Sequence, residues 1–324
     1  MISRPDVLVL GGGGVLGEAW MMGVLSGVED ATGFDLRQCE HFVGTSAGSI
    51  VAAYLVAGRA PTRPSSAGTE IELATPPLPD GPVAAAARRA AQRAGRLALA
   101  ASAGVAPIAL AAASPGTALV RAAVLNRIPR PPGSLEALHR AIADSGARFD
   151  GRLRIAAVDR RSGRRVMFGS PGSPDATVAQ AVEASCTVPW LFAPVTIGGR
   201  EYVDGGVWSP TNLDAAPAGR DTHVLCLNPT AGINGPHTLV AVARNMARSA
   251  VSLEMLALRR RGAVVQTLWP DPESAAAMGA DFMNHEPRSR VLAAGYRQGM
   301  MIATAESRAG GGAPAAIADS STER

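Results

Sequence analysis

Two short apolar runs, each followed by a glycine-containing turn and a helical pattern, occupy the first 58 residues of this 324-residue chain. The first run is Val7 to Leu10, and the second ends at Val43, directly before the stretch GTSAGSIVAAYLVAG. Strand, turn and helix repeated in this order are typical of a parallel sheet whose connecting helices pack on its faces. The N-terminal segment therefore predicts an α/β fold.

The α/β pattern is interrupted and then resumes. Residues 59–82 are rich in Pro, Ser, Gly and Thr and predict a loop, and the Ala/Arg-rich residues 83–125 predict a helical hairpin or lid. Pro107 and Pro115 break the uncharged part of that stretch, which argues against a membrane span. Strands are predicted near residues 153–158, 164–169, 222–229 and 263–270, with helices near residues 134–145, 176–185, 238–261 and 287–307.

These elements predict one domain over residues 1–308, with a variable insertion at about 59–133 and a disordered tail over 309–324. A net charge of +4 on a chain of this length is too small to predict binding to nucleic acid. Three widely spaced cysteines, Cys39, Cys186 and Cys226, form neither a disulfide framework nor a zinc site. We therefore expect a cytoplasmic protein without metal or cofactor, and its oligomeric state stays open.

The first motif with chemical meaning is Gly44-Thr45-Ser46-Ala47-Gly48, which lies where a predicted strand ends and a helix begins. A serine at the tip of such a turn is a candidate nucleophile. Glycines two residues to either side let backbone and substrate approach closely, and the helix N-terminus favours developing negative charge. An ordinary helix N-cap would explain Ser46 but not both flanking glycines.

The second motif is the glycine run in LGGGGVLGEAW. Its spacing, including Gly17, also fits a dinucleotide-binding turn, but Asp30 and Asp35 are poorly placed for the acidic residue that binds the ribose. Consecutive N–H groups at a helix N-terminus can instead form an oxyanion hole. The candidate donors are Gly12, Gly13 and Gly14.

The third motif is Asp204-Gly205-Gly206, which follows a predicted hairpin turn at Gly198-Gly199. A carboxylate at the end of the returning strand is a candidate general base, provided that it comes within hydrogen-bonding reach of Ser46. Alone, an Asp-Gly-Gly sequence more often marks only a turn.

In this order, the glycine run, GTSAG and DGG resemble the patatin-like phospholipases, as does the segment EASCTVPWLFAPVTIGGREYVDGGVWSPTN. The resemblance covers residues 5–58 and 150–230, is weaker to about 305 and is absent over 59–135. It implies a three-layer α/β/α sandwich with a mostly parallel central sheet. It also implies a lipid acyl hydrolase with a Ser46–Asp204 dyad, supported by Gly17, Gly44, Gly48, Gly205 and Gly206. Many members carry an arginine two residues after the glycine run, where this chain has Leu16.

Two alternatives remain open. A Ser-His-Asp triad on an α/β-hydrolase fold would use Ser46 with Asp204 or Asp221, although only two strands precede Ser46. The candidate histidines for that triad are His223, His237 and His285. In a non-enzymatic nucleotide-binding or scaffold protein, the glycines would only close turns.

The partner predicted by the resemblance is a lipid or another acyl ester. Four arginines without an intervening acid, Arg88, Arg89, Arg93 and Arg96, could in addition contact an anionic membrane surface at the inner face of the membrane. The alternative for this cluster is a solvated helix face.

Overall fold

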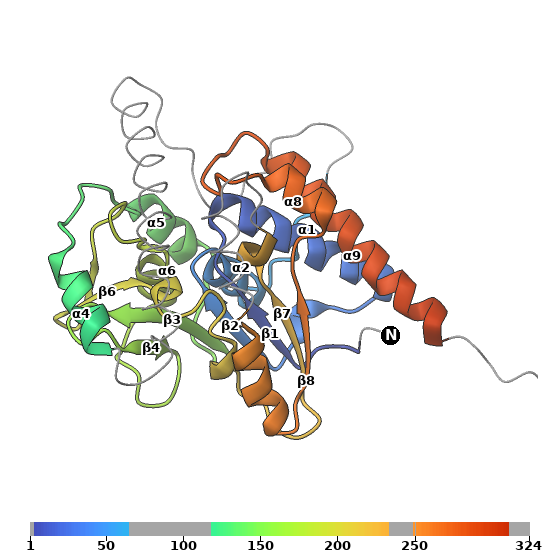
Figure 1. The fold of residues 1–324 in the computed structure, drawn as a ribbon, viewed down its shortest axis with the longest axis horizontal. Helices are drawn as coiled ribbons and strands as arrows, with labels where there is room; N and C mark the ends of the chain where they lie inside the picture. Colours follow the sequence, from blue (N-terminus) through green and yellow to red (C-terminus); the bar gives the residue numbers. More distant parts are fainter. Residues whose placement is uncertain (1–2, 65–117, 233–248, 250, 311–324) are drawn as a thin grey trace, which may run out of the picture.

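The computed structural model describes residues 3–64, 118–232, 249 and 251–310. Its centre is an eight-stranded sheet in the order β5-β6-β3-β2-β1-β7-β8, with β4 also paired to β3 (Figure 1). The strands are β1 Val7–Leu10, β2 His41–Thr45, β3 Leu153–Asp159, β4 Arg165–Phe168, β5 Val195–Ile197, β6 Arg200–Asp204, β7 His223–Leu227 and β8 Val264–Leu268. All pairs from β3 through β2, β1 and β7 to β8 are parallel, whereas β4, β5 and β6 are joined in antiparallel pairs.

Helices follow most of the parallel strands. They are α1 Gly14–Thr32, α2 Ala47–Val56, α4 Ala118–Arg127, α5 Glu136–Asp144, α6 Val178–Cys186, α8 Pro272–Met278 and α9 Arg288–Gly310. Residues 251–260 are also helical. Short 3-10 turns η1 Leu36–Gln38, η3 Gly205–Val207, η4 Leu213–Ala215 and η5 Pro229–Gly232 complete the described elements.

The alternation of side chains along β1 divides the core into two layers. Leu8 and Leu10 pack under α1, α2, α6 and α9, whereas Val7 and Val9 face the opposite side. There they meet η4 and the helix over residues 251–260, which lies below the sheet in Figure 1. Both faces of β1 are fully buried, as expected for a central parallel strand covered on both sides. The predicted α/β/α sandwich with a mostly parallel sheet is therefore confirmed.

The sequence predictions agree with most elements. The helix after the first strand ends at Thr32 with Gly33 in the left-handed conformation. Helix α8 was not predicted, although Asp271 caps it and Pro272 begins it, both of which are helix-start signals. Helix α9 includes residues 309 and 310, which belong to the predicted disordered tail. The remaining tail, residues 311–324, lies outside the described residues. Most of the predicted insertion, residues 65–117, also lies outside them.

Close packing between α1 and α9 depends on small residues. The two helices lie side by side along the outer layer (Figure 1). A Cβ atom added at Gly23 would overlap the backbone carbonyl oxygen of Leu292 on α9. A methyl group there can be accommodated only if the helices separate.

We expect Gly23→Ala to lower the free energy of unfolding by about 1–3 kcal/mol because it overpacks a backbone contact. Gly219→Ala is the matched control, since Gly219 is exposed and an added Cβ there meets nothing within 4 Å. The control should change stability by less than about 0.5 kcal/mol. Urea unfolding of both variants measures the difference, and equal stability would contradict close α1–α9 packing.

Candidate active site

The parallel pairing of β1 and β2 brings the first two motifs together. Leu10 pairs with Gly44, so both strands end at the same edge of the sheet and their following turns are neighbours. An added Cβ at Gly12 would lie 3.4 Å from the Cβ of Ser46. The glycine run therefore borders the serine, as its position in the sequence predicts.

Ser46 is held in an unusual backbone conformation between β2 and α2. Its φ is 52° and its ψ is −125°, a region that a non-glycine residue adopts only at a cost of about 1–3 kcal/mol. The flanking glycines are required by space, since a Cβ at Gly44 would meet the backbone of Ser49 and one at Gly48 would overlap the carbonyl of Leu10. The serine is half-buried rather than enclosed. This geometry is that of a nucleophile elbow.

Asp204, at the end of β6, faces this elbow. It is 5% exposed, and its carboxylate accepts a hydrogen bond from the N–H of Gly206 at 2.6 Å. Burial raises the pKa of Asp204 to about 6, and the nearby Ser46 hydroxyl and the Gly206 N–H oppose that rise. An anionic carboxylate is stabilised by the hydrogen bonds it accepts, while loss of water favours its protonated form. The carboxylate is therefore more basic than an ordinary aspartate.

The glycine run offers backbone donors beside the pair. The N–H of Gly12 donates to the carbonyl of Pro210 at 2.8 Å, which seats the run against the loop after Asp204. The N–H groups of Gly13 and Gly14 donate to no acceptor among the described residues. Both lie at the N-terminus of α1, whose dipole favours negative charge. Leu16, at the position where many members have arginine, is fully buried.

Three residues that the sequence analysis did not single out hold the pair in place. The Oγ of Ser185 accepts a hydrogen bond from the N–H of Ser46 at 2.9 Å, and the carbonyl of Thr187 accepts one from the N–H of Asp204 at 3.0 Å. Asn212, with a left-handed φ of 51°, donates to the Oγ1 of Thr45 at 3.1 Å. All three lie in the segment quoted for the resemblance, but their contacts are between residues far apart in sequence.

Two of the three histidines of the triad alternative lie within the described residues. His223 begins β7, at the edge of the parallel sheet opposite the ends that carry Ser46 and the glycine run. The Nδ1 of His285 contacts Arg288 at 3.4 Å, ahead of α9. His237 and the cluster Arg88, Arg89, Arg93 and Arg96 lie outside the described residues. All three cysteines are buried and free.

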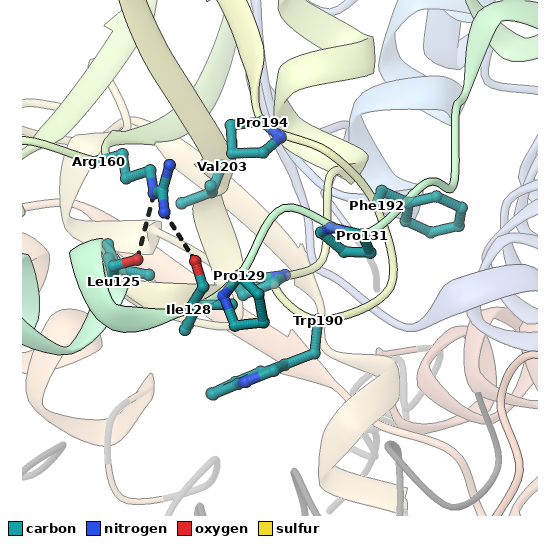
Figure 2. Close-up of a pocket in the computed structure, with 10 residues that line it drawn as sticks. Leu125, Ile128, Pro129, Pro131, Arg160, Trp190, Phe192, Pro194 and Val203 are labelled. Carbon is teal, nitrogen blue, oxygen red and sulfur yellow. Dashed lines mark hydrogen bonds between the residues drawn. The ribbon is translucent and has the colours of Figure 1, made fainter. Parts of the chain in front are cut away.

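A small apolar pocket lies beside the loop that follows α6 (Figure 2). Prolines and aromatic side chains of that loop line it, together with Leu125 at the end of α4 and Val203 of β6. The guanidinium of Arg160 is fixed in its wall by two backbone carbonyl groups, at 3.1 and 2.7 Å. Val203 packs with this cluster, whereas its neighbour Asp204 faces Ser46. The pocket is therefore separate from the candidate pair.

Two comparisons with known proteins give matches. The family model described as patatin-like phospholipase matches residues 8–217. Among solved structures, the chain is similar to VipD from Legionella pneumophila with a TM-score of 0.43 and 15% sequence identity, over 94% of this chain and 67% of that one. Comparison with curated proteins gives no match.

The chain belongs to the patatin-like phospholipase family, because the family model covers well over half of it, including all three motifs. Members of this family are hydrolases that act on lipid substrates. The resemblance stated from the sequence is thus confirmed. Within the described residues, no helix is both long enough and apolar enough to cross a membrane.

The backbone conformation of Ser46 makes a prediction about stability. Ser46→Gly and Ser46→Ala both remove the hydroxyl, but only glycine adopts the observed φ and ψ without strain. We expect Ser46→Gly to exceed Ser46→Ala in free energy of unfolding by about 1 kcal/mol, the strain relief being partly offset by the larger entropy of glycine in the unfolded chain. Denaturant titration compares the two, and a more stable alanine variant would contradict backbone strain at this position.

Proposed function

We propose that this protein is a serine acyl hydrolase of lipids, of the phospholipase A, lysophospholipase or esterase type, with Ser46 as nucleophile and Asp204 as general base. The observation that carries the proposal is that the Ser46 hydroxyl, on its strained turn, lies close enough to the buried carboxylate of Asp204 to lower its pKa. A nucleophile within hydrogen-bonding reach of a base of raised pKa is the arrangement that acyl transfer requires.

The proposed reaction has two halves. Asp204 accepts the hydroxyl proton while Ser46 Oγ attacks the ester carbonyl, and the proton then passes to the departing alcohol as the ester bond breaks. Water attacks the resulting acyl-serine, with Asp204 again taking a proton and returning it to Ser46 when the fatty acid leaves. No oxidant, metal or cofactor enters either half.

Charge that develops on the carbonyl oxygen needs donors that are already in position. We assign this role to the N–H groups of Gly13 and Gly14 at the start of α1, since they directly follow Gly12, which borders Ser46, and donate to no acceptor among the described residues. We assign Gly12 to seating the loop, because its own N–H is bonded to Pro210.

We expect Ser46→Ala to abolish hydrolysis of a short p-nitrophenyl ester and labelling by a fluorophosphonate probe, with the fold intact. Asp204→Asn should be nearly as damaging, because an amide keeps the shape of the carboxylate but cannot accept the proton. Removing members of a catalytic unit lowers kcat by about 10⁴-fold or more in comparable sites.

The matched controls are His223→Gln, His237→Gln and His285→Gln, each of which should retain most of the activity. A histidine variant as inactive as Ser46→Ala would replace the dyad with a triad. Full activity in Ser46→Ala would remove Ser46 as nucleophile.

The raised pKa of Asp204 predicts the pH dependence of the reaction. As a base, Asp204 must be ionised, so kcat/KM for a soluble ester should be highest above its pKa of about 6 and should fall tenfold per pH unit below it. An acid limb near pH 4 would indicate a carboxylate that stays hydrated. The limb should be unchanged in the three histidine variants.

A further inference from the structure

The C-terminal turn of α6 contacts both members of the proposed pair. Ser185 accepts the Ser46 N–H, and two residues later Thr187 accepts the Asp204 N–H. Between them, the Sγ of Cys186 lies 3.8 Å from the Oγ of Ser49, on the first turn of α2. Consecutive residues of one helix end thus reach the strand that carries the nucleophile, the helix behind it and the strand that carries the base.

These contacts matter because Ser46 and Asp204 do not come from neighbouring strands. The sheet order places β3 between β2 and β6, so the two backbones are about 10 Å apart. The hydrogen bonds of the sheet join β2 and β6 each to β3, but they do not join the end of β2 to the end of β6. The end of α6 supplies one direct connection across β3, and Asn212 supplies another by donating to the Oγ1 of Thr45 and the carbonyl of Gly205.

Helix α6 is firmly anchored. A capping box between Thr177 and Gln180 closes its first turn, and most of its side chains are buried in the main core. Glu183 pairs with the Nδ1 of His139 on α5 at 2.8 Å. Ser185 itself is fully buried. A helix fixed at its start and along its length provides a rigid reference for the residues at its end.

We propose that Ser185 is a positioning residue for the Ser46–Asp204 pair, acting through the hydrogen bond that its Oγ accepts from the Ser46 backbone. The inference rests on the proposed function, and it adds a residue that does not touch the reacting atoms. Because the Ser46 N–H is taken by Ser185, that N–H is unavailable as an oxyanion donor.

Loss of the Ser185 hydroxyl would leave a buried N–H without a partner at a strained turn. An unsatisfied buried donor is costly, so the turn would rotate to find another acceptor. Such a rotation moves the Ser46 hydroxyl relative to Asp204 while leaving the surface that receives the substrate largely in place. A displacement of about 1 Å can lower turnover by about 10²-fold.

The test compares Ser185→Ala and Ser185→Thr with the matched control Ser26→Ala. Ser26 is also fully buried, and its hydroxyl bonds only within α1, to Gly23 at 2.9 Å. With a soluble p-nitrophenyl ester, Ser185→Ala should lower kcat by about 10- to 100-fold and leave KM within about twofold. Ser185→Thr keeps the oxygen and should restore most of kcat, and Ser26→Ala should match the wild type.

The acid limb of kcat/KM gives a readout that a purely structural role would not move. The nearby Ser46 hydroxyl lowers the pKa of Asp204, so moving this hydroxyl away in Ser185→Ala should shift the limb upward from pH 6. The titratable groups around this helix end are Cys186 and Glu183 on α6, His139 on α5 and Glu18 on α1. Burial keeps the pKa of the Cys186 thiol well above its usual value, so this thiol stays neutral through the tested range.

The possible results separate the inference from the proposed function. Activity in Ser46→Ala would overturn the function itself. An inactive Ser46→Ala together with a fully active Ser185→Ala, or with a lowered kcat but an unshifted acid limb, would overturn only the positioning role. If circular dichroism shows that Ser185→Thr does not fold, Ser185→Cys takes its place, and its weaker acceptor should give a kcat between those of the wild type and Ser185→Ala.

Discussion

The parallel register of β1 against β2 is the constraint on which the site depends. Pairing of Leu10 with Gly44 brings the ends of the two strands level, so the glycine run and Ser46 turn away from the sheet at the same place. Helix α2 can start there only because Gly48 leaves room for the carbonyl of Leu10. Every side chain of β1 is buried, and a slip of one residue would exchange the two core faces. The first 58 residues thus form one half of the site by local folding.

The other half of the site depends on contacts between segments that are farther apart in the sequence. Asp204 arrives on an antiparallel hairpin, beyond β3, and its position is fixed by contacts from three directions. Thr187 holds its backbone from α6, Gly206 holds its carboxylate from the following turn, and Pro210 connects the next loop to Gly12. The half-buried Glu254 strengthens this loop from the helix over residues 251–260, since it accepts hydrogen bonds from Thr211 and the N–H of Leu213. Asp204 is consequently placed by tertiary structure rather than by its own strand.

This division explains what could be predicted from the sequence. The strand-turn-helix order, the glycine run beside Ser46 and the hairpin before Asp204 all follow from local signals, since turn chemistry and apolar periodicity act over a few residues. Ser185 and Asn212 could not be predicted in the same way, because a buried serine or asparagine has many roles and theirs depend on partners more than 130 residues away. Helix α8 has only 7 residues, and such a short helix carries little periodicity. The start signals at Asp271 and Pro272 alone were not enough to predict it.

Both members of the pair lower the stability of the fold. Ser46 occupies a strained backbone conformation, and Asp204 has a pKa raised by burial from 3.8 to about 6. Between about pH 4 and pH 6, Asp204 has lost its proton in the unfolded chain but still holds it in the folded chain. The contribution of Asp204 to stability therefore falls as the pH rises from about 4 to 6 and stays low above 6. This difference in pKa corresponds to roughly 3 kcal/mol of the free energy of unfolding. The hydrogen bond from Gly206 and the nearby Ser46 hydroxyl limit this cost, but further donors would return the pKa toward 4 and remove the basicity. The number of donors around Asp204 is therefore a compromise between a stable fold and the basicity that its proposed role requires.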